Sequence, residues 1–175
     1  MDGRKFNSLM PKYNELWAAN VLGMEVNRDA GPDLIDNEKA VEIKFRLLHQ
    51  GRYVYKGWTA LGYQLDYEKN YHEIYWGLGF YKIDREVDEI KSEDEINDER
   101  TLSRELYIVK WDWINQFPLY HQSGKTKISE WDHYLIYPKF RLLPKIIYEC
   151  NLEHGKLFFT EGVNPKRFNI NTKSL

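Results

Sequence analysis

Cysteine is almost absent from this chain of 175 residues, which contains a single one, Cys150. A lone cysteine excludes an internal disulfide and a cysteine-rich zinc site. Cys150 follows the apolar residues Ile146, Ile147 and Tyr148, so we expect its thiol to be packed in the core. Any chemistry that this protein performs is therefore expected to rest on other residues.

Long apolar runs are also absent. No stretch approaches the roughly 18 apolar residues that span a bilayer, and residues 1–7 lack the apolar segment of a signal peptide. We therefore expect a soluble, intracellular (cytoplasmic) protein. The histidines show no metal-ligand spacing, which disfavours an HNH-type nuclease or a zinc enzyme; they are His49, His72, His121, His133 and His154.

The composition is that of one globular domain. With 42% hydrophobic and 15% aromatic residues, the chain can form one well-buried core over residues 1–175.

The formal net charge of −2 does not suggest a nucleic-acid partner, but residues 84–105 hold ten acidic residues against four basic ones. The remainder is net positive, which permits a polyanionic partner. We expect the acidic stretch to be an excursion that buries little and lies away from any bound DNA.

The apolar pattern predicts a mixture of helices and strands. Helical spacing predicts an amphipathic helix over residues 9–22, with its regular part beginning near Pro11 and a stop at Gly23. Gly77 and Gly79 lie on one face of a predicted central strand, where they would permit close approach of a helix or a ligand backbone. Further elements are predicted at 58–70 (helix), at 71–83, 106–111 and 157–160 (strands), at 131–137 and 145–148 (strands or helix ends) and at 112–117 (short helix capped by Asp112), followed by a polar tail at 163–175.

The stretch from Gly31 to Arg46 predicts a β-hairpin. Two short strands, 33–35 and 40–45, flank a tight turn, and apolar residues alternate with charged ones along the second strand. If Asn37 and Glu38 form a two-residue turn, Asp33 lies opposite Glu42. Directly opposed residues share a face of the sheet, with β-carbons roughly 4.5–5.5 Å apart. The hairpin thus predicts two neighbouring carboxylates.

Two carboxylates at that separation repel each other unless a cation lies between them. Mg²⁺ is the natural candidate because it prefers hard oxygen ligands, and the carbonyl of Ile43 could add a ligand. Lys44 projects from the same face as Glu42, where its ammonium group could orient or deprotonate a water and neutralise phosphate charge. The alternative is a solvent-facing hairpin with ordinary cross-strand pairs. Asp36 is a lesser candidate ligand, because its place beside the turn favours a capping role.

Asp33 preceded by Pro32, and then Glu42-Ile43-Lys44, resembles the motif of the PD-(D/E)XK nuclease superfamily. The resemblance covers residues 31–46, and more loosely 11–70. It implies an α/β restriction-endonuclease-like core, with a mixed central β-sheet flanked by helices. It also implies that the aspartate and glutamate bind metal and that the lysine assists the attacking water. By position, Glu15 matches the upstream helix glutamate of the superfamily, and Gln64 the glutamine that some members carry on the following helix.

The resemblance implies a Mg²⁺-dependent endonuclease that hydrolyses DNA, with Mn²⁺ as an alternative metal. We expect Arg28, Arg46, Arg52 and Lys56 to contact nucleic acid, since basic residues hold backbone phosphates. Because one active site cuts one strand, double-strand cutting would call for a homodimer or successive nicks. Two alternatives stay open: a non-catalytic binding or scaffold protein that retains the nuclease fold, and a nuclease that acts on RNA.

Overall fold

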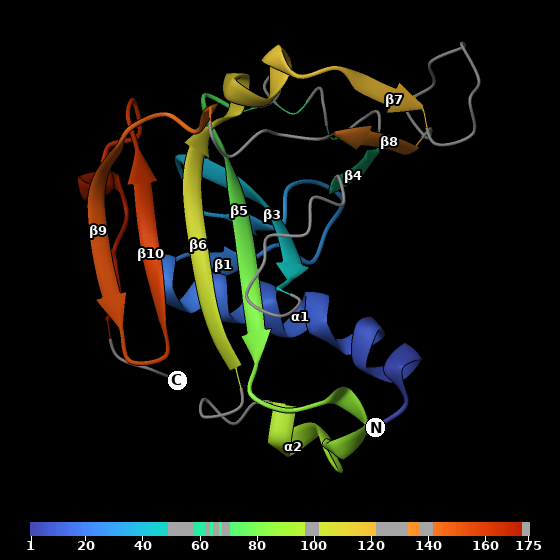
Figure 1. Ribbon diagram of the computed structural model, residues 1–175. Coiled ribbons are helices and arrows are strands. Elements are labelled where there is room, and N and C mark those ends of the chain that lie inside the picture. Colours follow the sequence, from blue (N-terminus) through green and yellow to red (C-terminus); the bar gives the residue numbers. More distant parts are fainter. Residues whose placement is uncertain are drawn as a thin grey trace.

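A computed structural model describes residues 1–48, 58–61, 64, 67, 71–96, 102–121, 133–136 and 142–172. Its centre is a mixed seven-stranded sheet in the order β1-β2-β3-β5-β6-β10-β9, and a small sheet, β4-β8-β7, lies beyond one end (Figure 1). Strand β3 is parallel to β5, and β6 is parallel to β10. The α/β class expected from the sequence is therefore correct. The elements are α1 (Gly3–Leu22), β1 (Glu25–Val26), β2 (Leu34–Ile35), β3 (Lys39–Leu47), β4 (Trp58–Leu61), β5 (Glu73–Ile83), η2 (Val87–Glu89), α2 (Glu93–Ile96), β6 (Leu102–Lys110), η3 (Trp111–Gln116), β7 (Leu119–His121), β8 (His133–Ile136), β9 (Ile146–Leu152), β10 (Gly155–Thr160) and η5 (Pro165–Arg167).

Helix α1 begins about two turns earlier than predicted, so the expected start near Pro11 is wrong. The Asp2 side chain caps the helix by accepting a hydrogen bond of 2.9 Å from a backbone N–H of the first turn. Phe6 and Met10, 1% and 2% exposed, bury the early turns. Their packing offsets the helix hydrogen bond that proline cannot donate. The helix ends before Gly23, whose φ of 64° suits glycine, as predicted.

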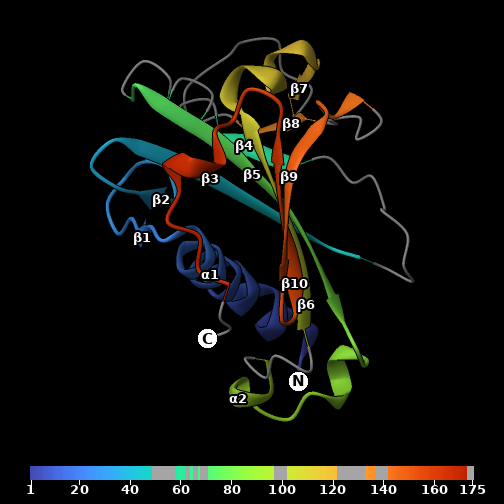
Figure 2. The ribbon, with the colours of Figure 1, turned by 90° about the vertical axis from the view of Figure 1, so that its left-hand side faces the viewer.

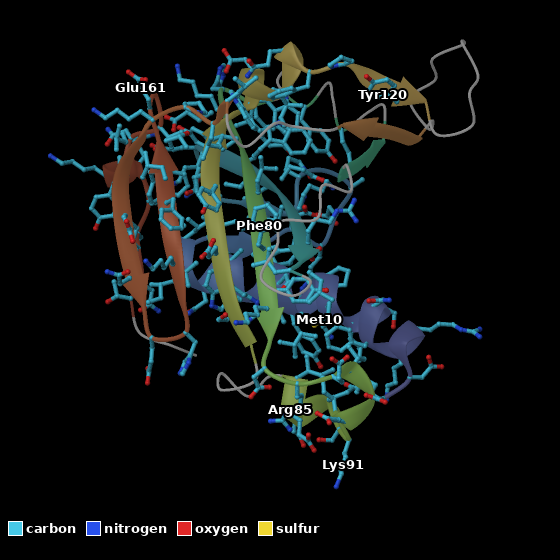
Figure 3. The ribbon with its side chains drawn as sticks, viewed as in Figure 1. Met10, Phe80, Arg85, Lys91, Tyr120 and Glu161 are labelled. Carbon is cyan, nitrogen blue, oxygen red and sulfur yellow. The ribbon has the colours of Figure 1, made fainter. Side chains whose placement is uncertain are left out.

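The acidic segment from Asp84 to Ile96 is packed more tightly than predicted. Ile90 and Ile96 are fully buried in a cluster with Phe6 and Met10. Figure 3 shows Met10 on the side of α1 that faces this segment, while Arg85 and Lys91 lie on its outer rim. The other described residues from Asp84 to Ile96 are exposed or partly buried, and β6 already begins at Leu102. Two isoleucines are enough to anchor an otherwise charged segment.

The two faces of the main sheet are covered differently. Helix α1 packs on one face (Figure 2), against apolar side chains from β3, β6 and β10. The other face carries an aromatic cluster with η3. Gly77 and Gly79 of β5 make room for side chains of the neighbouring strand: a Cβ would lie 2.5 Å from Ile43 Cδ1 and 2.4 Å from Phe45 Cε1, respectively. The space thus belongs to β3 and not to a helix or ligand backbone.

The helix predicted at 58–70 is wrong at its start, where residues 58–61 form strand β4. This strand pairs antiparallel with β8, so that Trp58 lies opposite Ile136. Four residues are too few to separate helical from strand periodicity, and pairing with a distant segment decides the outcome. Residues 62–63, 65–66 and 68–70 of that prediction lie outside the described part.

Strands β9 and β10 extend beyond the predicted segments 145–148 and 157–160, and β8 lies within the predicted segment 131–137. Cys150 is 6% exposed within the core, as expected. The predicted polar tail is wrong, because Val163 and Phe168 are 1% and 6% exposed and belong to the core on the α1 side. Asp112 does not cap the short helix; η3 begins after Lys110, without a side-chain cap. No helix in the described ranges is both long and apolar enough to cross a membrane.

Candidate metal and phosphodiesterase site

The β2–β3 hairpin has the register predicted from its turn. Ile35 lies opposite Ala40, and Asp36 N–H donates to the Lys39 carbonyl (3.0 Å) across the turn. Asp36 Oδ1 accepts hydrogen bonds from the backbone N–H groups of Glu38 (2.9 Å) and Lys39 (2.8 Å). This carboxylate is therefore used in capping the turn, and its pKa is lowered by hydrogen bonds from Lys39 and Glu38 despite some burial.

Asp33 extends the hairpin by one further step. It lies just before β2, and its backbone carbonyl accepts a hydrogen bond of 2.8 Å from Asn27 N–H. Its side-chain Oδ2 accepts a hydrogen bond of 2.7 Å from the backbone N–H of Ile43. In an extended strand the N–H and C=O of one residue point to the same side. The Ile43 carbonyl therefore points to the edge of β3 where the Asp33 carboxylate lies.

Glu42 is the buried centre of the cluster, with no exposed surface. Its Oε1 accepts hydrogen bonds from Lys44 Nζ (2.5 Å) and Gln64 Nε2 (2.8 Å). Its Oε2 is also buried, but no donor in the described part of the chain reaches it. The negative charge of Asp33 lies close enough to Glu42 to raise the pKa of the Glu42 carboxyl group further. An oxygen in this position calls for a proton or a cation.

Glu15 brings a third carboxylate to the cluster from helix α1. Its half-buried side chain lies within electrostatic range of Asp33, Glu42 and Lys44. Burial and the negative charge of Asp33 raise the pKa of Glu15 to about 7, although Lys44 acts in the opposite direction. The structure thus brings together five residues that the sequence analysis named: Glu15, Asp33, Glu42, Lys44 and Gln64.

The charges in this cluster are unbalanced. Three carboxylates face one ammonium group, and burial is the largest cause that raises the pKa of Glu42 to about 7. Burial also raises the pKa of Asp33, against the effects of Lys44 and the Ile43 N–H. Burial alone would lower the pKa of Lys44, but Glu42, Asp33 and Glu15 together raise it. Lys44 is therefore firmly protonated, whereas two carboxylates are poised to ionise near neutral pH.

Trp76 is a neighbour of Glu42 that sequence reasoning missed. It lies opposite Glu42 in the parallel β3–β5 pair and stacks on Trp111 with ring centroids 4.2 Å apart. Its Nε1 is buried and has no acceptor among the described residues. The Trp76 ring, with Trp111 stacked on it, keeps water away from Glu42 and explains why this carboxyl group is so strongly desolvated. Only the parallel register, which joins residues 34 positions apart, could have revealed this contact.

Of the four basic residues predicted to contact nucleic acid, the structure describes two. Arg28 is exposed in the loop before Asp33, and Arg46 is partly buried two residues beyond Lys44 on β3. Arg52 and Lys56 lie outside the described residues. Contacts of these basic residues with nucleic acid stay a prediction.

The fit of a divalent cation can be judged from the donors present. Within the described ranges, no three Asp, Glu, His or Cys side chains are already grouped as the ligand set of one ion. The buried Oε2 of Glu42 nevertheless meets no donor from the residues that the structure describes, and the hard oxygen donors around it carry excess negative charge. Such a donor set suits Mg²⁺. No protein-family model matches this chain, and no curated protein or solved structure matches it either.

Proposed function

We propose that this protein is a Mg²⁺-dependent endonuclease that hydrolyses DNA phosphodiester bonds through a PD-(D/E)XK-like site. One observation carries the proposal: the buried Oε2 of Glu42, which no donor of the described residues reaches, lies among carboxylates beside a protonated lysine. A solvent-facing hairpin would leave these groups hydrated, but Glu42 has no exposed surface. A buried polar atom that lacks a hydrogen-bond donor is costly, and binding sites are where such a cost is tolerated.

Asp33, Glu42 and the Ile43 carbonyl would hold the metal, with Glu15 as a further carboxylate ligand. Mg²⁺ would supply charge neutralisation for the phosphate and a more acidic water. Gln64 fixes the rotamer of Glu42 through its hydrogen bond to Oε1. Asp33 is fixed in turn by the Ile43 N–H. Both carboxylates are thus oriented before any ligand arrives.

Lys44 would act on the water and the phosphate as a hydrogen-bond donor. Its pKa is raised by the surrounding carboxylates, so the side chain keeps its proton at neutral pH. A protonated ammonium group cannot accept a proton, which favours orientation of the water over its deprotonation. Its positive charge would also stabilise the negative charge that develops on the phosphate during attack.

The test is cleavage of supercoiled plasmid, branched DNA and single-stranded DNA, each with Mg²⁺ and with EDTA. We expect Mg²⁺-dependent cleavage that is lost in Glu42→Ala and Lys44→Ala. Glu38→Gln is a matched control, because this acid lies on the same hairpin but is exposed and bound to Arg167. Conversion of plasmid to nicked circles before linear molecules would indicate successive nicks, whereas direct linearisation would indicate a homodimer.

Two outcomes would overturn this proposal. Cleavage that persists in both alanine variants would place the activity elsewhere. DNA binding without cleavage, together with no carboxylate-dependent Mg²⁺ or Mn²⁺ binding, would instead support a non-catalytic scaffold. Cleavage of DNA and RNA duplexes of matched sequence identifies the substrate, because an RNA-directed nuclease would cut only the RNA duplex.

A further inference from the structure

Arg104 is a buried cation in the middle of the sheet that no carboxylate approaches in the described part of the chain. It lies on β6 beneath α1 and is 9% exposed. Its Nε donates a hydrogen bond of 2.8 Å to Asn14 Oδ1, and its guanidinium group lies 5.6 Å from the centroid of the Trp17 ring. Burial lowers the pKa of Arg104 to about 10. Asn14, at 2% exposure, is itself buried.

Both contacts of Arg104 are made to one helix, around one residue of the candidate site. Asn14 and Trp17 are three residues apart and share a face of α1, and Glu15 lies between them in sequence. A helix can be held by apolar contacts in more than one rotation, because such contacts are non-directional. A hydrogen bond and a cation–π contact have defined geometry, so together they fix the rotation of α1 about its axis.

The contacts of Arg104 and Trp17 continue to Phe45 of β3, the strand that carries Glu42 and Lys44. The Trp17 ring meets Phe45 edge-on, with centroids 6.1 Å apart and an interplanar angle of 84°. Phe45 directly follows Lys44 on β3 and occupies the space above Gly79. Trp17 therefore lies between Arg104 of β6 and Phe45 of β3. These contacts tie the position of α1 to that of β3.

We propose that Arg104 is a positioning residue that holds α1 in the one rotation that directs the Glu15 carboxylate at Asp33 and Lys44. This inference rests on the proposed function, in which Glu15 assists in binding a divalent cation. Side chains reach about 5–6 Å from a helix axis, so a rotation of roughly 30° would move this carboxylate by about 3 Å. Metal ligands tolerate only about 0.2 Å of displacement. Loss of the Arg104 contacts would thus move the Glu15 carboxylate out of the site, although Glu15 itself is not substituted.

The test is Mn²⁺ binding to the full chain, followed by electron paramagnetic resonance, in a double-mutant cycle. We expect Glu15→Gln to weaken Mn²⁺ binding about ten-fold, and Arg104→Met to weaken it by a similar factor, as for supporting residues in other metal sites. In Arg104→Met/Glu15→Gln the affinity should equal that of Glu15→Gln alone, because both changes remove the same ligand. Arg104→Lys, which keeps the charge near Trp17, should restore part of the affinity.

Arg85→Met is the matched control, since Arg85 pairs with Asp84 and Glu95 far along the chain from the site. Multiplicative losses in the double variant, or wild-type affinity in a folded Arg104→Met, would overturn the inference and leave the proposed function standing. If Arg104→Met does not fold, Asn14→Ser applies the same cycle to the other partner. Absence of Mn²⁺ binding in the wild-type protein would overturn the proposed function and this inference with it.

Discussion

Replacement of Glu42 by glutamine should change how the stability of the metal-free protein depends on pH. Glu42 has no exposed surface, and its Oε2 faces no donor among the described residues. The folded protein therefore favours the protonated carboxyl group. Glutamine has nearly the same shape and cannot ionise, so Glu42→Gln removes the titration while it keeps the packing.

The sign and size follow from the pKa of Glu42, which is about 7 in the folded protein against an ordinary value of 4.5. The folded state holds a proton that the unfolded chain releases, so its stabilising effect is complete below pH 4.5 and is lost as the pH rises through 7. One pKa unit corresponds to about 1.4 kcal/mol, so the loss is about 3 kcal/mol. Because Asp33 and Glu42 titrate together, this free energy belongs to the pair.

The assay is urea unfolding in EDTA, followed by tryptophan fluorescence, near pH 5 and near pH 8. We expect the free energy of unfolding of Glu42→Gln to gain about 2–3 kcal/mol relative to the wild type between these two conditions, because part of the loss already occurs below pH 5. Glu38→Gln should show no such gain. Mg²⁺ at about 100 times its Kd should stabilise the wild type by about 2.7 kcal/mol at the higher pH and leave Glu42→Gln unaffected. Equal pH dependence in the wild type and Glu42→Gln would refute the reasoning.

Three further predictions test separate parts of the structure. Gly79→Ala places a Cβ 2.4 Å from Phe45 Cε1, so it should lower the free energy of unfolding by about 1–3 kcal/mol; an unchanged urea midpoint would contradict the packing of β3 on β5. Ile96→Ala removes a fully buried side chain from the acidic segment and should cost about 2–5 kcal/mol, whereas a loss below about 0.5 kcal/mol would show that the segment is not part of the core. Gln64→Leu removes the 2.8 Å hydrogen bond to Glu42 Oε1 and should weaken Mg²⁺ binding about ten-fold by calorimetry; unchanged affinity would exclude an orienting role.

The hairpin was predictable because its signals are local. The turn residues and the alternation of Val41, Ile43 and Phe45 with charged residues set the register, and the observed pairing of Ile35 with Ala40 confirms it. That register brings Asp33 next to Glu42 without any knowledge of the rest of the chain. The roles of the site residues stay predictions, because geometry alone does not show chemistry.

The sequence-based predictions are wrong where contacts with distant segments determine the structure. Residues 58–61 have the spacing of a helix but pair with β8, about 75 positions away. Ile90 and Ile96 are hidden in sequence by the acids around them, yet both pack against α1. Trp76 lies beside Glu42 and desolvates it because β3 and β5 pair in parallel, which no local pattern encodes. Long-range pairing therefore determines the environment of the candidate site, while local signals determine that the hairpin brings Asp33 next to Glu42.

The most direct test of the central claim is Mg²⁺ binding to the wild-type protein and to Glu42→Ala, measured by isothermal titration calorimetry near pH 8. We expect the wild-type protein and the Glu38→Gln control to bind Mg²⁺ and Glu42→Ala to lose that binding, because no donor in the described part of the chain reaches the buried Oε2 of Glu42. Wild-type protein that binds no Mg²⁺, or Glu42→Ala that binds it with unchanged affinity, would contradict the account.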